Sequence, residues 1–443
     1  MTRNLDTATS LVERMKSGEF SAAELVQDCL NQIAATEPAV KAWAHLDADN
    51  ALAQAGALDE LRYLGKPLGP LHGVPVGIKD IYDTADMPTE YNSPIHAGRQ
   101  PDTDCTAIAK LREAGAIIMG KTVTAEFAFV SPGETTNPHH PKHTPGGSSS
   151  GSAAAVAAGH VPLAVGSQTN GSVIRPASFC GTFGFKPSRG MISRHGVLQT
   201  SETLDQLGVF ARSLEDAALL TDALTGYDIS DTATYTRAKP DMIAGCQEEA
   251  PVEPTFAWFD LPFADRLPED AREGFDELFD ALEGRIQRFD APGHFGDIIE
   301  HHRVIHLYEV RRNLADQFEN HADQISPVLV ELLTAANEIS ANQYAAALGA
   351  VDAAREFFNE FFEEFDAVIT PSSAGQAPRS LDSTGDPIFC TIWTFAGLPA
   401  LSLPLMTGDD DLPVGVQLVA NLEEDARLCR TANWLLQYLS EDR

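Results

Sequence analysis

The sequence is poor in lysine: nine of its 443 residues are lysines, and the last of them is Lys239. Lysine and arginine together number 31 against 64 aspartates and glutamates, so the formal net charge is −33. Because like charges repel at long range, this balance argues against nucleic-acid phosphate or an anionic membrane as a partner. The hydrophobic fraction of 43% is that of an ordinary globular protein and excludes wholesale disorder.

Long apolar runs and cysteine clusters are also absent. No stretch of about 18 uncharged apolar residues occurs, so no membrane-spanning helix is expected. The first 20 residues alternate charged and apolar side chains where a signal peptide would have an apolar core. The six cysteines lie far apart without a Cys-x-x-Cys pair, which is typical of buried thiols in a reducing compartment. These absences predict a soluble, cytoplasmic protein.

Hydrophobic periodicity predicts alternating strands and helices along the first half of the chain. Residues 8–60 show helical spacing, and short β-branched runs at 74–79 and 116–119 flank a predicted helix at 103–115. A small-residue helix at 152–158 follows a tract rich in proline, glycine and serine. The strand–helix–strand order favours an α/β sheet.

The second half of the chain changes character twice. From 263 to 365 the pattern is helical, acidic and without motifs, whereas buried-strand character returns at 367–370, 400–403 and 414–419. No internal repeat or long linker is present. We therefore predict one sheet built from both ends of the chain, with a helical excursion between them.

The first segment with candidate chemistry is Gly-Gly-Ser-Ser-Ser-Gly-Ser at 146–152. Such a composition suits a flexible linker, but small residues before a helix also expose backbone N–H groups and hydroxyls to a ligand. A Walker loop is excluded because no Gly-Lys-Ser/Thr follows. A nucleophile elbow around Ser149 is excluded because three prolines, not a strand, precede it.

Two further segments carry candidate chemistry. Gly-Ser-Gln-Thr-Asn-Gly-Ser at 166–172 follows a predicted strand and presents Ser172 in a tight loop, whose N–H groups could point into one concavity. An ordinary strand–turn is the alternative. Lys79 closes the strand-like run 74–79; burial near hydroxyls would lower its pKa and make it a base. Its alternative is a solvated pair with Asp80.

Two groupings of histidines have spacings that could suggest a metal site. One lies in a proline-broken loop and the other at helical i, i+4, i+7 spacing: His139, His140 and His143, and His302, His306 and Glu309. No His-Glu-x-x-His pattern occurs, and histidines on a partly polar helix are usually surface or core residues. We expect neither a metal nor another cofactor.

Taken in this order, the segments resemble the amidase signature family of serine hydrolases. The resemblance rests on Gly-Val-Pro-Val-Gly-Ile-Lys-Asp at 73–80, Thr-Pro-Gly-Gly-Ser-Ser-Ser-Gly-Ser at 144–152 and the loop 166–172. Further matches are at 176–187, 397–404 and 412–417. The match covers about 8–225 and 355–443 and is weak across the acidic middle.

The resemblance implies the family's fold: an α/β protein whose single large mixed β-sheet is sandwiched between helices, with a helical variable region between two conserved parts. The single domain, 1–443, is expected to comprise N-terminal helices at 1–60, a catalytic core at 61–225, a substrate-lining helical region at 226–354 and the rest of the core at 355–443.

By this resemblance, Lys79 is the catalytic lysine, Ser148 the bridging serine, usually held in a cis peptide, and Ser172 the nucleophile. Neutral Lys79 would take a proton from Ser148, which takes one from Ser172 as it attacks the carbonyl, and water would hydrolyse the acyl-enzyme. An acidic surround would keep an exposed lysine protonated, so this chemistry requires Lys79 to be buried. The oxyanion would be held by four consecutive backbone N–H groups: those of Thr169, Asn170, Gly171 and Ser172.

The sequence departs from the commonest family pattern around the nucleophile. Gln168 and Asn170 replace an aspartate and a glycine, so a carboxylate near the lysine is missing and a side chain is added at the pocket wall. The common arginine two residues after the nucleophile is displaced to Arg175, and Ser149 is expected to support the geometry without reacting. Gln168, and Trp393 followed by threonine, are typical of bacterial stand-alone amidases.

The motifs leave the scissile bond open, because relatives cleave amides, anilides, esters and carbamates (urethanes) with the same machinery. Aromatic and aliphatic side chains in the variable region favour a small apolar or aryl substrate. The candidate pocket residues are Phe127, Phe129 and Trp393. No nucleic-acid or membrane partner is expected, and the protein is predicted to be a monomer or homodimer.

Two alternative functions are compatible with these motifs. The glutaminase subunit of a tRNA-dependent amidotransferase has the same motifs but needs a partner chain, and a net charge of −33 suits a tRNA complex poorly. A non-catalytic binding protein could keep the fold. The presence of all three catalytic side chains argues against that second alternative.

Overall fold

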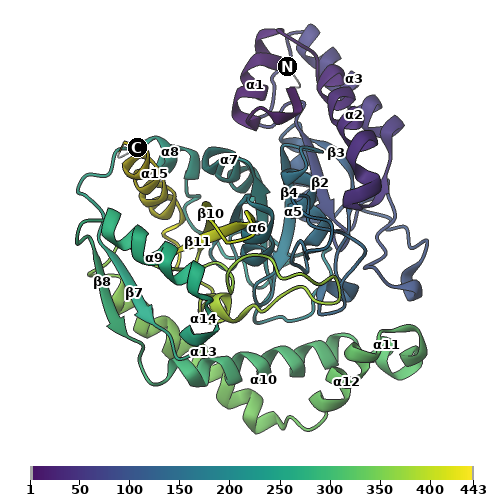
Figure 1. The fold of residues 1–443 in the computed structure, drawn as a ribbon. Helices are drawn as coiled ribbons and strands as arrows, with labels where there is room; N and C mark the ends of the chain where they lie inside the picture. The colour runs from purple at the N-terminus through teal and green to yellow at the C-terminus, as the bar shows by residue number, and fades with distance from the viewer. Residues whose placement is uncertain (1–2, 442–443) are drawn as a thin grey trace.

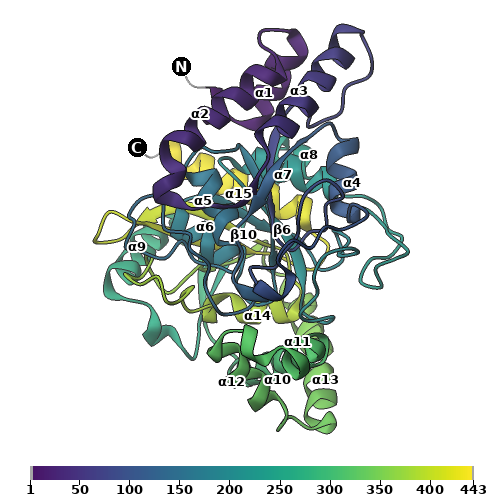
Figure 2. The same cartoon turned by 90° about the vertical axis from the view of Figure 1, so that its right-hand side faces the viewer.

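The computed structural model describes residues 3–441, and Figures 1 and 2 show its ribbon from two directions. Across these residues one mixed sheet of 11 strands runs in the spatial order β1-β3-β2-β4-β6-β5-β10-β11-β9-β7-β8. The strands are β1 Trp43–Leu46, β2 Pro75–Lys79, β3 Ile117–Thr122, β4 Leu163–Gln168, β5 Phe183–Lys186, β6 Gln206–Ala211, β7 Phe256–Asp260, β8 Ile286–Asp290, β9 Ala367–Pro371, β10 Ala400–Thr407 and β11 Pro413–Val419.

The sheet combines parallel and antiparallel pairs. Strand β2 pairs in parallel with both β3 and β4, and β7 pairs in parallel with both β8 and β9. The remaining neighbours are antiparallel. The central strands β2, β3, β4 and β6 are buried along their whole length, which explains their nearly continuous apolar sequences.

Helices cover the sheet and extend beyond it at both ends. They are α1 Ala8–Ser17, α2 Ala22–Val40, α3 Ala48–Tyr63, α4 Thr106–Glu113, α5 Ser150–Ala157, α6 Ile174–Cys180, α7 Leu214–Leu224, α8 Met242–Gln247, α9 Glu269–Ala281, α10 Phe295–Asn313, α11 Ala315–Asn320, α12 Pro327–Ala336, α13 Ala341–Phe361, α14 Ile388–Ala396 and α15 Asp425–Glu441. Figures 1 and 2 both show α1–α3 at one end of the molecule and α10–α13 at the opposite end.

Short helices bring the serine-rich loops onto the sheet. Helix α5 packs on β2 and β4, and α6 packs on β5, β10 and β11. The residues of α6 are all buried, as are those of α5 up to Val156. Because each of these helices starts directly after a serine-rich loop, their burial places both loops against the same region of the sheet.

The α/β fold with one large mixed sheet is confirmed, but the middle of the chain is not purely helical. Strand β8 lies inside the stretch predicted to be helical, and β7 precedes it; both extend the sheet. Strand β8 is an edge strand whose residues are half-buried or exposed, so its sequence lacks the apolar run of a buried strand. Strand β1 was missed because its four residues are only partly buried.

No helix within residues 3–441 is long and apolar enough to cross a membrane. The further division of the chain into four functional parts stays a prediction.

A glycine in α5 allows the close contact that positions the first serine loop. A Cβ atom at Gly151 would lie 2.3 Å from the Ala42 carbonyl oxygen and 2.4 Å from the Val123 nitrogen, both of them backbone atoms. We expect Gly151→Ala to lower the free energy of unfolding by roughly 1–3 kcal/mol, because the helix must move away from its neighbours. Thermal denaturation followed by circular dichroism measures this.

The control is Gly349 in the middle of α13, where a Cβ would meet no atom within 4 Å. Gly349→Ala is expected to raise stability by about 0.5–1 kcal/mol, because alanine has the higher helix propensity. Equal melting temperatures for Gly151→Ala and the parent protein would contradict the close-contact argument.

Candidate active site

Lys79 lies at the end of β2, between β3 and β4, and is completely buried. Its Nζ donates hydrogen bonds to Ser148 Oγ at 2.7 Å and to Ser167 Oγ at 2.8 Å. Burial lowers the pKa of Lys79 well below its usual value, and the charge of Asp205 only partly opposes this shift. Burial therefore shields Lys79 from the acidic surface, as the proposed chemistry requires.

Ser148 lies in the loop that enters α5, and the Gly147–Ser148 peptide is cis. The loop is held from three sides. The Ala125 N–H donates to the Ser148 carbonyl, the Arg175 guanidinium donates to the Gly147 carbonyl at 2.7 Å, and Lys79 binds the Ser148 hydroxyl. The backbone and the hydroxyl of Ser148 are thus both fixed.

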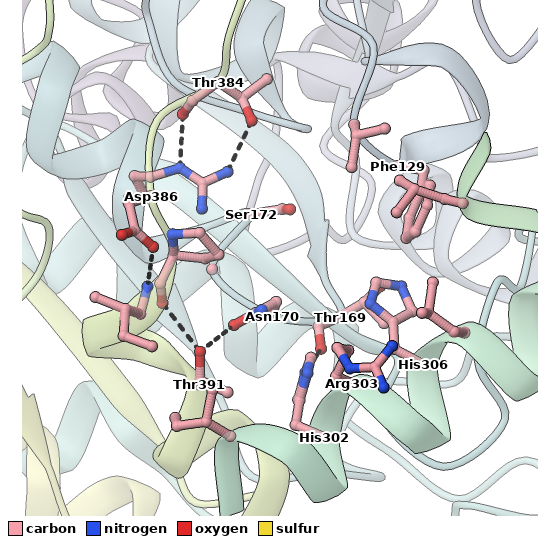
Figure 3. Close-up of a pocket in the computed structure, with 18 of the residues that line it drawn as sticks. Phe129, Thr169, Asn170, Ser172, His302, Arg303, His306, Thr384, Asp386 and Thr391 are labelled. Atoms are coloured by element: carbon pink, nitrogen blue, oxygen red, sulfur yellow. Dashed lines mark hydrogen bonds between the residues drawn. The ribbon is translucent and has the colours of Figure 1, made fainter. Parts of the chain in front are cut away.

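Ser172 opens onto a cavity of about 420 Å³ that lies between the loop 169–172 and the helices α10, α12 and α14. Figure 3 shows Ser172, Asn170 and Phe129 around this cavity. Among residues 3–441 the Ser172 hydroxyl makes no hydrogen bond to another side chain and is nearly buried. The structure brings Lys79 and Ser148 into direct contact and places Ser172 at the cavity wall.

The loop between β4 and α6 carries four consecutive backbone N–H groups without partners. Those groups belong to Thr169, Asn170, Gly171 and Ser172, which all line the cavity, and none donates to another residue within 3–441. A run of free N–H groups beside a serine hydroxyl is the arrangement that an oxyanion needs.

The three expected supporting residues bind the loops on which the serines lie. The Ser149 hydroxyl bonds to the Ser167 backbone at 3.2 Å. The Gln168 carboxamide accepts from the N–H groups of Val173 and Ile174 and donates to Thr394 Oγ1 at 2.9 Å. Gln168 thus satisfies the amide groups at the start of α6, a task for which its side chain needs no charge.

Arg175 is buried and joins the first serine loop to the segment before α14. Its Nε and Nη2 donate to the carbonyl and the hydroxyl of Thr384, in addition to the bond to Gly147. Burial lowers the pKa of Arg175 to about 10, so the guanidinium stays charged at neutral pH. Its Nη1 lies only 3.0 Å from where a Cβ of residue 171 would be, which accounts for Gly171.

Of the three candidate pocket residues, only Phe129 lines the cavity. Phe127 is buried with positive φ, and its ring packs toward Tyr91 and His96. Trp393 is buried against Phe358, with 5.5 Å between ring centroids. The prediction was wrong for these two residues because an aromatic side chain next to a motif can face either the core or the cavity.

Sequence reasoning also missed several residues of the site. Ser167 was quoted only as part of a loop, although it is the second hydroxyl on Lys79. His302 donates to the Thr169 carbonyl, and Thr394 donates to the Asn170 carbonyl. No signal in the sequence places Ser167 or His302 here.

The histidine groupings do not form a metal site in the described part of the chain, residues 3–441. His302 and His306 both line the cavity, but Glu309 is turned to other partners and accepts hydrogen bonds from Thr203 and Tyr344.

A sequence model of the Amidase family matches residues 24–429, which is most of the chain. The chain belongs to the amidase family. Its reaction is therefore hydrolysis of the amidase signature type, at a carbon–nitrogen bond.

Curated relatives of this amidase agree over nearly the whole length. One glutamyl-tRNA(Gln) amidotransferase subunit, from Rhodopirellula baltica, is 33% identical, and the match covers 97% of this chain and 95% of the relative. The subunit of the same name from Chloroflexus aurantiacus is 34% identical, with 96% and 95% covered. Their names correspond to the glutaminase alternative and favour it over the stand-alone amidase interpretation.

Solved structures of other amidases superimpose closely on this one. A chain from a vestigial protein complex, described as revealing the origins of an s-triazine catabolic enzyme, has a TM-score of 0.91 at 28% identity and 98% coverage of both chains. The peptide amidase of Stenotrophomonas maltophilia has a TM-score of 0.84 at 29% identity, covering 97% of this chain and 96% of its own. This amidase is thus similar in structure both to a member of a complex and to a peptide amidase.

Proposed function

We propose that the protein hydrolyses the amide-type bond of a small apolar or aryl substrate through an acyl-enzyme on Ser172. The observation that carries this proposal is the buried contact between Lys79 Nζ and Ser148 Oγ, which places a proton acceptor next to the hydroxyl of the first serine loop. A serine hydroxyl is a poor nucleophile at neutral pH unless a base takes its proton.

The proposed reaction moves protons along one line. Neutral Lys79 accepts the proton of Ser148, and Ser148 accepts that of Ser172 while Ser172 Oγ attacks the carbonyl carbon. The free N–H groups of 169–172 stabilise the oxyanion. Ser148 then returns a proton to the departing nitrogen, so the amine leaves neutral, and water hydrolyses the ester on Ser172.

The cavity lining supports an apolar substrate group. Most of the wall is hydrocarbon, contributed by Ala128, Phe129, Val130, Ile299, Leu307, Leu332, Ala335 and Ile388. The charged side chains of the wall already have protein partners: Glu300 pairs with Arg303, Asp386 with Arg266, and Arg175 binds Thr384. An uncharged substrate therefore suits this cavity better than a zwitterionic one.

The bond cleaved is proposed to be an amide, with anilides, esters and carbamates as related substrates. A panel of butyranilide, phenyl carbamates, short aliphatic amides and glutamine, assayed with the purified protein by itself, tests this. We expect the aryl compounds to have the highest kcat/KM. If small polar amides are cleaved fastest, the apolar-substrate proposal is wrong.

The second candidate is the glutaminase subunit of a tRNA-dependent amidotransferase, which the names of the curated relatives favour. This function requires partner subunits, so a homo-oligomer or monomer active by itself would argue against it. Ammonia release from glutamine that appears only when the other amidotransferase subunits are added would favour it over the main proposal.

Phe129 offers a direct test of the substrate cavity. Its ring is half-buried, lines the cavity and packs edge-on against His306 with 4.7 Å between centroids. We expect Phe129→Ala to raise KM for aryl substrates by roughly 5- to 30-fold, since an aromatic contact of about 1–2 kcal/mol is lost. Steady-state kinetics on an anilide and on a short aliphatic amide measure the difference.

The matched control is Phe127→Leu, which alters an aromatic residue two positions away that does not line the cavity. It is expected to lower thermal stability while leaving KM unchanged. Equal increases in KM for the aryl and the aliphatic substrate in Phe129→Ala would contradict a specific aryl contact.

A further inference from the structure

Two consecutive carbonyl groups of the loop 169–172 are held by side chains from distant parts of the chain. His302 on α10 bonds the Thr169 carbonyl at 2.9 Å, and Thr394 on α14 donates to the Asn170 carbonyl at 2.5 Å. Figure 3 shows His302 below the loop, with its bond to Thr169 drawn. Both carbonyls belong to the segment whose N–H groups are free.

In both bonds the side chain is the donor and the carbonyl oxygen is the acceptor. A carbonyl oxygen only accepts, so His302 Nε2 must carry a hydrogen. Burial lowers the pKa of His302 to about 4, so at neutral pH the ring is neutral and its other nitrogen is unprotonated. The Thr394 hydroxyl accepts from Gln168 Nε2 and therefore gives its own hydrogen to Asn170.

Because a peptide unit is planar, these two bonds to carbonyl groups also orient the N–H groups of Asn170 and Gly171. The peptides that join 169 to 170 and 170 to 171 are trans, so in each the C=O and the N–H point in opposite directions. Holding the Thr169 carbonyl against His302 therefore fixes the direction of the Asn170 N–H, and holding the Asn170 carbonyl against Thr394 fixes that of the Gly171 N–H.

Other contacts keep α10 in place, so the position of His302 is precise. Glu309, two turns along the same helix, accepts hydrogen bonds from Thr203 and from Tyr344 on α13. Thr169 is held a second time, because its hydroxyl donates to the buried carboxylate of Asp205 at 2.5 Å. The loop is thereby fastened by its side chains and its carbonyls, while its N–H groups remain free.

We propose that His302 and Thr394 are positioning residues of the oxyanion hole, which turn the N–H groups of Asn170 and Gly171 toward the substrate oxygen. This inference rests on the proposed acyl-enzyme chemistry of Ser172. It gives α10, in the region expected only to line the substrate, a part in transition-state stabilisation. Neither side chain touches the reacting atoms in this role.

The test compares His302→Phe, which cannot donate, with His302→Gln, whose amide nitrogen can replace Nε2. The substrate is p-nitrophenyl butyrate, and phenylboronic acid serves as a probe that forms a tetrahedral anion on the serine. For His302→Phe we expect kcat to fall roughly 10- to 100-fold with KM within about threefold, and the inhibition constant of phenylboronic acid to rise by a similar factor as kcat falls. His302→Gln is expected to recover most of both losses.

The matched control is His301→Phe, which changes the preceding residue of α10 and is expected to leave kcat unchanged. If His302→Phe does not fold, Thr394→Val, which removes the other donor with little change in shape, is measured in the same way. A normal kcat in either folded variant overturns the inference, as does a loss that His302→Gln does not recover. If Ser172→Ala retains full activity, the proposed function fails instead.

Discussion

Ser172→Ala is expected to reduce kcat/KM by about 10⁵-fold or more, because no other group can form the acyl-enzyme. Ser172 is the serine that lines the cavity beside the free N–H groups, and its hydroxyl has no competing side-chain partner within residues 3–441. The variant should fold normally, since only one nearly buried hydroxyl is lost. Initial rates on the best substrate of the panel, with thermal denaturation as a check on folding, measure the effect.

The control for this experiment is Ser150→Ala in the neighbouring loop. The Ser150 hydroxyl makes one hydrogen bond, to the Val123 carbonyl at 3.3 Å, and does not face the cavity. Its loss is expected to change kcat/KM by less than about threefold. Undiminished turnover in Ser172→Ala would rule out the serine-hydrolase mechanism.

Lys79→Met is expected to lower kcat/KM by roughly 10²- to 10⁴-fold, the usual contribution of a positioned general base. Methionine fills a similar volume without an amine, so Ser148 keeps its place in the cis-peptide loop but loses its proton acceptor. Lys110→Met is the control: Lys110 is half-buried and, within residues 3–441, donates only to the Thr225 carbonyl, so its replacement should leave activity unchanged.

The same lysine sets the pH dependence of the parent enzyme. Only the neutral amine accepts a proton, and burial lowers the pKa of Lys79 well below 10.5. Activity should therefore be retained at neutral and alkaline pH and fall as the pH drops through the lowered pKa, because Lys79 is then protonated. A kcat/KM profile measured from pH 5 to pH 10 tests this, and activity that rises only near 10.5 would show that Lys79 is not shielded.

The strands that carry the chemistry could be predicted because their sequences are apolar and uninterrupted. The runs at 74–79, 116–119 and 414–419 correspond to β2, β3 and β11 within a few residues. Strands β1 and β8, at the two edges of the sheet, were missed because half-exposed residues break the buried pattern there. The interior strands β5, β6 and β7 were not predicted either. Edge strands are stabilised by pairing with a neighbour, and such pairing is not visible in a local window.

The site divides in a similar way between local and distant residues. Lys79, Ser148 and Ser172 stand in short segments of unusual composition, so their chemistry could be inferred one segment at a time. Whether an aromatic residue faces the cavity or the core could not, as Phe127 and Trp393 show. That choice depends on the packing of neighbouring helices, which local sequence does not specify.

The sequence by itself determined the family and the reaction class. It also predicted that Lys79, one lysine among nine in an acidic protein, must be buried. The order of three compact motifs was sufficient for this, since each motif supplies its reactive group from its own residues. Only the tertiary structure decided what surrounds those groups: Ser167 against Lys79, and His302 and Thr394 against the carbonyls of the loop. Positions 133 and 224 residues apart along the chain meet there because buried helices must satisfy their polar side chains wherever packing places them.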